Sequence, residues 1–593
     1  MYYASGNYEA FVHPRKPKDV DNKSAYIIGA GLAGLATATY LVRDGQMKPE
    51  NIHILESSKI SGGACDGNKQ VHGYFMRGGR EMDNHFECMW DLYKDIPSYE
   101  DPSQTVLDYY YYLNKDDPNS SKCRATINCG QNAQTGDKFT LDDVAQNELL
   151  KLFLTKEELL EDKKISDFFS EHFWKSNFWL YWQTMFAFQR WSSALEMKRY
   201  LQRFVHHIKG LPDFTALRFT RYNQYESMIL PLINYLKTKG IEVEYGYDVK
   251  NVIFDIKNTK KVAKQIIYKN GDEQKSIKLT ENDLVFITNG SCVDSTCYGW
   301  QDKVVDTSGL KDGVGDSWDM WKAIAKQDIS FGNPDNFCNN IKETNWMSAT
   351  IQTSNDEIIK YIEKICQRDP RTGKVVTGGI VTVRDSEDNW FLSWTINRQP
   401  QFRSQDKKDV LVWMYSLNTE KPGNFVKKSM KDCTGAEVAM EWLYHIGFPQ
   451  DKIQEFATKE CNTTTSYMPY INAFFQPRKN SDRPKVVPEN SVNFAFIGQF
   501  AETSRDTIFT TEYSIRTAME SVYTLLDIER GVPEVWPSAF DIRNLLKASY
   551  YAMDQKKLTD KKMNFIQKQV IKHVLKKIKD TDIDLLLKEY KLI

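Results

Sequence analysis

Three features of the amino-acid sequence predict an α/β fold with a Rossmann-like, discontinuous nucleotide-binding domain. A glycine-rich turn follows a strand-like run near the N-terminus, further strand-like runs occur in the middle, and a strand–glycine–helix pattern returns near the C-terminus. Long insertions separate these three pieces. The chain has 593 residues, which at roughly 150 residues per domain suggests about four structural units.

The first element in chain order is a dinucleotide-binding motif, in which a strand-like run leads into a G-x-G-x-x-G turn and then a helix with periodic apolar residues. Gly29 permits the sharp turn, Gly31 lets the backbone approach a pyrophosphate, and Gly34 allows the helix to pack closely on the strand. Glu56 ends the second strand, at the distance where a carboxylate binds ribose hydroxyls. A glycine-rich turn without a ligand is the alternative.

Two later features favour FAD over NAD as the nucleotide. The pair Gly62–Gly63 follows the second strand closely, as in flavoproteins. Near the C-terminus, an apolar run ends in Gly498 and leads to a helical run that begins near Thr511. In flavin enzymes such a unit directs the positive end of a helix at the flavin ring.

The middle of the chain supplies the remaining strands of this domain. The runs that contain Val249 and precede Asn289 resemble strands that pass the adenine and return to the pyrophosphate. The predicted FAD-binding domain thus has three segments, at 20–90, 200–300 and 488–540. Between them we expect a largely helical insertion at 91–199 and a mixed α+β substrate domain at 301–487, followed by C-terminal basic amphipathic helices at 541–593.

The overall charge excludes a generally basic, nucleic-acid-binding protein, because 78 lysines and arginines nearly balance 79 aspartates and glutamates. The N-terminus lacks the basic and apolar regions of a signal peptide. No stretch reaches the ~18 to 20 apolar residues of a membrane-spanning helix. We therefore expect a cytoplasmic protein. The 10 cysteines have no metal-ligand spacing, so we predict free thiols and no metal site.

The run Arg77-Gly-Gly-Arg80-Glu81-Met82 is the first candidate for chemistry. Its two glycines indicate a backbone bend beside the flavin ring. A carboxylate at this place is a candidate general acid or base if apolar surroundings raise its pKa. A structural ion pair of Glu81 with Arg77 or Arg80 is an equally good interpretation of the pattern.

The motifs G-A-G-L-A-G-L-A, R-G-G-R-E-M, E-M-K-R-Y-L and D-T-I-F-T-T-E-Y-S together resemble the oleate hydratases, also called the myosin-cross-reactive antigen family. The resemblance covers essentially the whole chain. It implies a hydro-lyase that contains FAD and adds water to a cis double bond of a free unsaturated fatty acid such as oleate or linoleate, without net redox change. It also implies a homodimer.

The resemblance assigns roles to individual residues. Glu81 would orient and activate the water, and Tyr200 would protonate the alkene. The fatty-acid carboxylate would bind Thr395 and Asn397, whereas Gln401 stands where the family has a histidine. The residues predicted to bind the cofactor are Gly29, Gly31, Gly34, Glu56, Gly62, Gly63, Met82, Val249, Asn289 and Thr511.

The C-terminal segment has a separate character, because apolar residues recur at helical spacing from Met563 to Ile578 while lysines occupy another face. Such a basic amphipathic helix is typical of contact with an anionic membrane surface. A docking helix with a solvated lysine face is the alternative.

Two other function classes remain open from the sequence. One is a redox flavoenzyme of the amine oxidase or desaturase type, which would share the nucleotide-binding fold. The other is a non-catalytic, membrane-associated protein that binds FAD.

Overall fold

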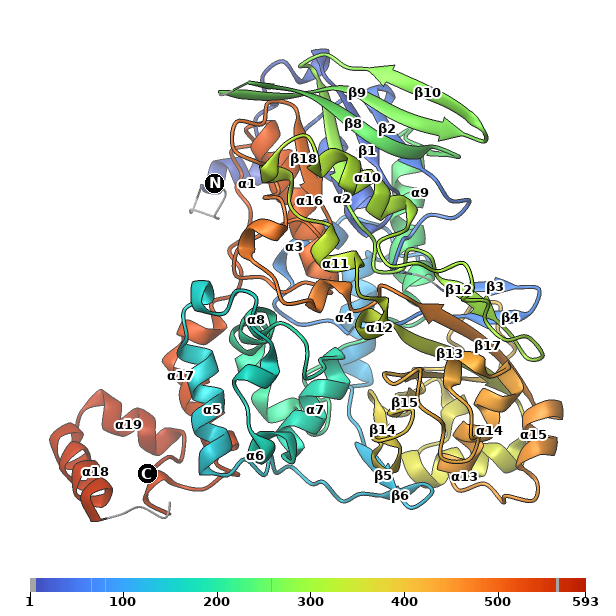
Figure 1. Ribbon diagram of the computed structural model, residues 1–593. Helices are drawn as coiled ribbons and strands as arrows, with labels where there is room; N and C mark the ends of the chain where they lie inside the picture. Colours follow the sequence, from blue (N-terminus) through green and yellow to red (C-terminus); the bar gives the residue numbers. More distant parts are fainter. Residues whose placement is uncertain (1–6, 66, 80, 258, 561–564) are drawn as a thin grey trace.

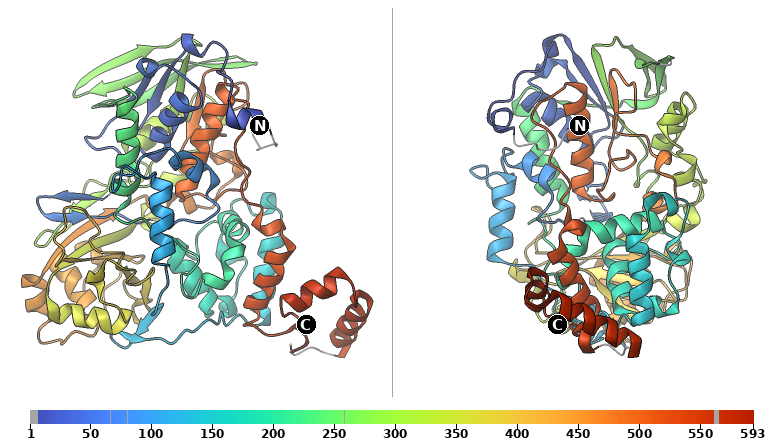
Figure 2. Two further views of the ribbon diagram at one scale, coloured as in Figure 1. Left: turned by 180° about the vertical axis from the view of Figure 1, so that it is seen from behind. Right: turned by 90° about the vertical axis from the view of Figure 1, so that its left-hand side faces the viewer.

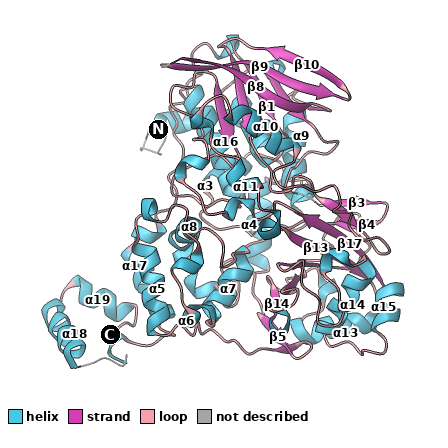
Figure 3. Cartoon of the chain, viewed as in Figure 1, coloured by secondary structure: helices cyan, strands magenta, loops and turns pink. Residues whose placement is uncertain are grey.

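The computed structural model describes residues 7–65, 67–79, 81–257, 259–560 and 565–593. Figure 1 shows an α/β region at the top, a second region built on a mixed sheet at the lower right, helices between them, and a C-terminal helical extension at the lower left. The strands gather in the first two regions, and the lower left is helical (Figure 3).

The centre of the upper region is a five-stranded parallel sheet in the order β18-β11-β1-β2-β7. Its strands come from three widely separated stretches of the chain, which confirms the predicted α/β fold class. Near-continuous apolar runs such as that of β11 are typical of parallel strands that are covered on both faces. The strands are β1 (Ser24–Ile28), β2 (Ile52–Glu56), β7 (Val243–Tyr245), β11 (Asp283–Thr288) and β18 (Phe494–Ile497).

Two different layers cover this sheet. Alternate residues such as Ile27 and Phe286 face α2 and α16, which pack against each other. The intervening residues, such as Ile28 and Val285, face an antiparallel three-stranded sheet and α10. The covering elements are α2 (Leu32–Arg43), α16 (Thr511–Leu525), α10 (Asp316–Ala325), β8 (Asp248–Lys257), β9 (Lys260–Asn270) and β10 (Glu273–Lys278).

The second region is built on an eight-stranded mixed sheet in the order β12-β17-β13-β16-β15-β14-β5-β6. One face packs on α13 (Asp356–Cys366), α14 (Gly435–His445) and α15 (Ile453–Lys459). The opposite face turns Trp413 and Tyr415 toward the middle of the molecule. The strands are β12 (Cys297–Gly299), β13 (Trp346–Thr353), β14 (Val381–Val383), β15 (Leu392–Thr395), β16 (Val410–Ser416), β17 (Cys461–Met468), β5 (Ala125–Ile127) and β6 (Gln131–Asn132).

Helices fill the space between the two sheets and extend beyond them. The hairpin of β3 (Asn68–Gln70) and β4 (Gly73–Phe75) lies on β17. The helices are α3 (Glu87–Tyr93), α4 (Val106–Asp116), α5 (Asp143–Leu154), α6 (Glu171–Trp174), α7 (Asn177–Phe186), α8 (Ala194–Phe204), α9 (Leu230–Thr238), α11 (Asp335–Cys338), α12 (Ile341–Thr344), and, near the C-terminus, α17 (Ile542–Ala552), α18 (Phe565–Ile578) and α19 (Asp582–Glu589).

The last two helices project from the body of the molecule, as Figure 1 and the left view of Figure 2 show. Val570 and Val574 of α18 are exposed. Met563, which the sequence pattern places on the same apolar stripe, lies outside the described residues. Among the helices that the structure describes, none is long and apolar enough to cross a membrane.

Candidate functional site

The glycine-rich turn leaves space that side chains would fill. Gly29 has a φ of 97°, in the region that favours glycine. A Cβ on Gly34 would lie 2.0 Å from the Gly29 carbonyl oxygen, so α2 can approach β1 this closely only with glycine there. Gly31 pairs with Gly62, and a Cβ on Gly63 would lie 3.3 Å from the Gly31 Cα. The two glycine segments therefore form one cradle at the N-terminus of α2.

Polar groups of the predicted cofactor site surround this cradle. The Glu56 carboxylate accepts hydrogen bonds from the Ala30 N–H at 2.7 Å and from the Ser58 N–H at 2.8 Å, which holds it at the end of β2. Asn289 follows β11, and its Oδ1 is buried without a hydrogen-bond partner among the described residues. Thr511 is buried in the first turn of α16. The glycine cradle, where no side chain intervenes, and the unpartnered Asn289 oxygen fit a bound dinucleotide.

Val249 has a different environment from these residues. It lies in β8, and its buried side chain packs with Ile28 of β1 and Leu55 of β2 in the apolar layer beneath the parallel sheet.

The five residues predicted for catalysis and substrate binding surround two adjoining cavities. Thr395, Asn397 and Gln401 line the first, together with Glu81; we call it the polar cavity. Its other polar lining residues are Thr220, Tyr222, Asn223 and Gln224.

Glu81 and Tyr200 line the second cavity, which we call the aromatic cavity. Glu81 thus belongs to both cavities. The remaining lining of the aromatic cavity is mostly apolar and includes Met82, Phe86, Met185, Phe186, Phe204, Leu211, Leu217 and Phe509.

Tyr200 is held by its helix and by a ring of aromatic side chains. It lies on α8 with only 1% of its surface exposed, and its hydroxyl donates a hydrogen bond to the Ile508 carbonyl. The rings of Phe186 and Phe188 lie edge-on at 4.9 and 5.0 Å. This enclosure excludes bulk water from the tyrosine hydroxyl.

The segment that carries Glu81 forms hydrogen bonds with its surroundings at Met82 and at Arg77. Met82 is buried and exchanges two backbone hydrogen bonds with Arg218, at 3.1 and 3.2 Å. Arg77 donates to the Gly63 carbonyl at 2.6 Å, which connects this segment to the glycine cradle. Arg80, one of the two arginines considered as an ion-pair partner of Glu81, lies outside the described residues.

Gln401 presents its amide to the polar cavity. Its backbone is held by Asn223 and by Gln405, with distances of 2.9 and 2.7 Å. Its Oε1 is buried and has no hydrogen-bond partner among the described residues. Thr395 shares a 2.8 Å hydrogen bond with Thr377. The Gln401 amide oxygen is therefore available to a donor in this cavity, while its backbone is already hydrogen-bonded.

The sequence did not predict two sets of residues at these cavities. Gln224 lines the polar cavity. A charged cluster of Asp83, Arg203, His206 and His207 adjoins the aromatic cavity, and Asp83 and His207 form part of its lining. In the sequence, this cluster was indicated only by the charged residues that recur among the apolar ones of α8, of which Arg203 is one.

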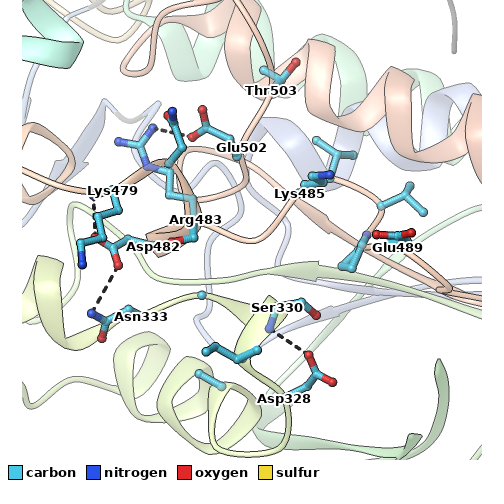
Figure 4. Close-up of a pocket in the computed structure, with 18 of the residues that line it drawn as sticks. Asp328, Ser330, Asn333, Lys479, Asp482, Arg483, Lys485, Glu489, Glu502 and Thr503 are labelled. Atoms are coloured by element: carbon cyan, nitrogen blue, oxygen red, sulfur yellow. Dashed lines mark hydrogen bonds and ion pairs between the residues drawn. The ribbon is translucent and has the colours of Figure 1, made fainter. Parts of the chain in front are cut away.

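A much larger cleft lies elsewhere. It has a volume of about 1410 Å³, and Figure 4 shows its walls, with Asp328, Lys479, Arg483 and Glu502 among them. Among the described residues, none that was predicted to bind cofactor or substrate lines it. Size alone does not identify a site, because binding also needs convergent groups of the right chemistry.

Comparisons with known proteins match this chain over most or all of its length. Residues 22–523 match the model of the MCRA family. The chain is 50% identical over 597 residues to an oleate hydratase of Streptococcus pyogenes serotype M49 (strain NZ131), with 100% of both chains covered. It is 29% identical over 570 residues to a linoleate hydratase of Lactiplantibacillus plantarum, which covers 90% of this chain and 97% of the relative.

Solved structures match with lower sequence identity. A CLA-producing fatty acid isomerase from P. acnes is 12% identical, with a TM-score of 0.45, over 85% of this chain and 98% of that chain.

Proposed function

Because the chain belongs to the MCRA family, as its sequence motifs predicted, we propose that it is a fatty acid hydratase. The reaction adds water to a cis double bond of a free unsaturated fatty acid of the oleate or linoleate type and gives a hydroxy fatty acid. The full-length relatives, an oleate hydratase and a linoleate hydratase, support this substrate class.

One observation carries the proposal: Glu81 lines both cavities. A polar cavity that adjoins an apolar one matches the chemistry of a long substrate with a polar end, and each cavity, at about 50 Å³, has to widen to admit it. Its head group would bind Thr395 and Asn397 in the polar cavity, and its chain would pass Glu81 into the aromatic cavity. There the double bond would reach Tyr200.

The chemistry follows from the weak reactivity of an isolated alkene, which must gain a proton as water attacks. The Tyr200 hydroxyl gives its proton to one alkene carbon, while the oxygen of water bonds to the other. The Glu81 carboxylate accepts the proton that this water loses, and its charge stabilises the developing cation. Because a tyrosine hydroxyl is a weak acid, with an ordinary pKa of about 10, both proton transfers belong to one concerted step. Return of the proton from Glu81 to Tyr200 completes the cycle.

We further propose FAD as the cofactor, held by the glycine cradle, with Glu56 toward the ribose and the first turn of α16 toward the flavin. Hydration transfers no net electrons, so bound FAD would supply structure and charge rather than redox chemistry. Met82 and Glu81 would be ordered by it, since Arg77 already connects their segment to Gly63.

Anaerobic incubation with oleate tests the proposal against a redox flavoenzyme. A hydratase gives a product that has gained one water and consumes no oxidant, which product mass spectrometry detects. A desaturated or oxidised product would support the redox alternative. If no product forms even with reduced flavin, the chain is a binding protein instead.

We also propose that α18 contacts an anionic membrane surface, where the substrate resides. Its exposed Val570 and Val574 alternate with Lys568, Lys572 and Lys576 along the helix. Co-sedimentation with anionic vesicles should be lost when residues 550–593 are removed, and equal binding by the shortened chain would contradict this. The family resemblance further implies a homodimer, which light scattering of the eluting protein would test.

A further inference from the structure

A buried charged cluster joins the segment that carries Glu81 to the helix that carries Tyr200. Asp83 follows Glu81 by two residues. Arg203 lies near the end of α8, beyond Tyr200, and the 3₁₀ helix Val205–Gly210 that follows holds two histidines. The side chains of Asp83 and Arg203 are 2% and 0% exposed. The histidines of the cluster are His206 and His207.

Three residues that follow Tyr200 in the chain surround the Asp83 carboxylate: His206 and His207 hydrogen-bond to its Oδ1, and Arg203 forms a longer ion pair with its Oδ2. Its Oδ1 lies 2.8 Å from His207 Nε2, and its Oδ2 lies 3.4 Å from His206 Nε2 and 3.7 Å from Arg203 Nη1. Burial raises the pKa of Asp83, but the histidine hydrogen bonds and the Arg203 charge outweigh it and hold the pKa well below its ordinary value. Asp83 is therefore an ionised carboxylate inside the protein.

The same cluster continues to the helix at the proposed cofactor site. Arg203 Nε lies 3.3 Å from Asp506 Oδ1, and Asp506 Oδ2 lies 3.1 Å from Arg516 Nε on α16. Arg203 also donates to the His85 carbonyl, just beyond Asp83. Three elements far apart in the sequence thus share one buried set of charges.

Two histidines and a carboxylate can also hold a metal ion. Here Arg203 places a fixed, fully buried positive charge beside Asp83. A metal cation would compete with this guanidinium for the same carboxylate, so the cluster is better suited to joining protein segments.

We infer that Asp83, held by Arg203, His206 and His207, is a positioning residue that fixes Glu81 relative to Tyr200. The inference rests on the proposed function, which makes these two residues the base and the acid. Proton transfer needs heavy atoms within about 2.6–3.2 Å, and a displacement of about 1 Å costs about 100-fold in rate. Asp83 and His207 also line the aromatic cavity, directly beside the reacting pair.

The primary test is Asp83→Asn, which keeps the shape of the side chain and removes its charge. We expect kcat for oleate to fall about 100-fold, with KM little changed because the head-group residues lie in the polar cavity. Glu441→Gln is the matched control. Glu441 is also a buried carboxylate bonded to a histidine, His445 at 3.0 Å, and it lines neither cavity. Its replacement should lower Tm and leave kcat unchanged.

A double-mutant cycle separates positioning from general damage. If Asp83 acts through Glu81, adding Asp83→Asn to Glu81→Gln should cause little further loss of kcat. Fully multiplicative losses would overturn the inference, and so would near-normal kcat in the single Asp83→Asn variant. Stoichiometric metal in the purified protein that disappears in Asp83→Asn would overturn it as well. If instead Glu81→Gln and Tyr200→Phe keep full activity, the proposed function itself fails.

Discussion

The polar and aromatic cavities share Glu81 but differ in what surrounds them. In the polar cavity, hydroxyls and neutral amides surround the ligand space, and Glu81 is the one charged group among its described lining residues. In the aromatic cavity, apolar side chains form the walls, and Asp83 and His207 connect it to buried charges behind. Many modest contacts in the first suit recognition, whereas the second depends on two groups in fixed positions. Substitutions should therefore act on KM in one cavity and on kcat in the other.

The largest effects are expected at the reacting pair in the aromatic cavity. Glu81→Gln and Tyr200→Phe should each reduce kcat by about 10² to 10⁴-fold, because each removes one proton transfer. Both variants keep the shape of the side chain, so fatty-acid binding should survive. Hydroxy-acid formation and oleate binding, measured in parallel, check this. Near-full turnover by either variant would refute the role of that residue.

Gly31→Ala tests whether the aromatic cavity depends on the glycine cradle. The added Cβ would lie at an ordinary 3.7 Å from the Gly63 Cα, so the protein itself accommodates it, but it occupies the space proposed for the pyrophosphate. We expect FAD affinity to fall at least 10-fold, roughly 1.4 kcal/mol, with hydratase activity falling in proportion. Flavin absorbance titration measures the affinity.

Gly309→Ala, where nothing lies within 4 Å of the added Cβ, is the matched control. It should bind FAD normally. Normal FAD binding by Gly31→Ala would place the cofactor elsewhere.

Thr395→Val tests how much the loss of one hydroxyl in the polar cavity weakens substrate binding. It removes one hydrogen-bonding hydroxyl with little change of shape, which costs about 1 kcal/mol. We expect KM for oleate to rise about fivefold while kcat stays within a factor of two of the original. Steady-state kinetics measure both constants. A loss confined to kcat would contradict the assignment of substrate binding to the polar cavity and of catalysis to the aromatic cavity.

Gln401→His should produce the smallest change in KM, and this change should depend on pH. A protonated histidine attracts a carboxylate, and the bound carboxylate raises the pKa of the imidazole. The gain in affinity is therefore fully present below about pH 6.5, the ordinary histidine value, and is lost as the pH rises through the raised pKa of the complex. KM for oleate measured across this range should diverge from the wild-type KM only on the acid side. A gain that is equal at all pH values would exclude a charge effect.

Local patterns in the sequence predicted most of the fold. The turn at Gly29 and Gly34 depends on backbone space within a few residues, so its spacing is diagnostic. In contrast, β5 has three residues and gains its partner β14 only through tertiary contact, so no periodicity revealed it. Short strands carry too little pattern to be distinguished from loops.

The candidate site likewise combines residues that the sequence identified with residues that it did not. Glu81 stands out because two glycines and two arginines precede it, and Tyr200 was assigned only through family resemblance. Asp83 and His207 look ordinary in the sequence, since each gains its meaning from a partner on a distant segment. The predicted cofactor and substrate residues remain predictions, although the structure places most of them around one cradle and two cavities.

The pairing of β5 with β14 has a consequence for synthesis on the ribosome. Arg124 donates to the Ile380 carbonyl 256 residues further along the chain, and Ile380 lines the polar cavity. At about 5–20 residues per second, a chain must wait on the order of 10 to 50 seconds before that partner emerges. During this interval the β5 segment has an unpaired edge and its aromatic neighbours are uncovered. This part of the mixed sheet, and the wall of the polar cavity that Ile380 forms, can therefore be completed only after the second half of the chain has been made.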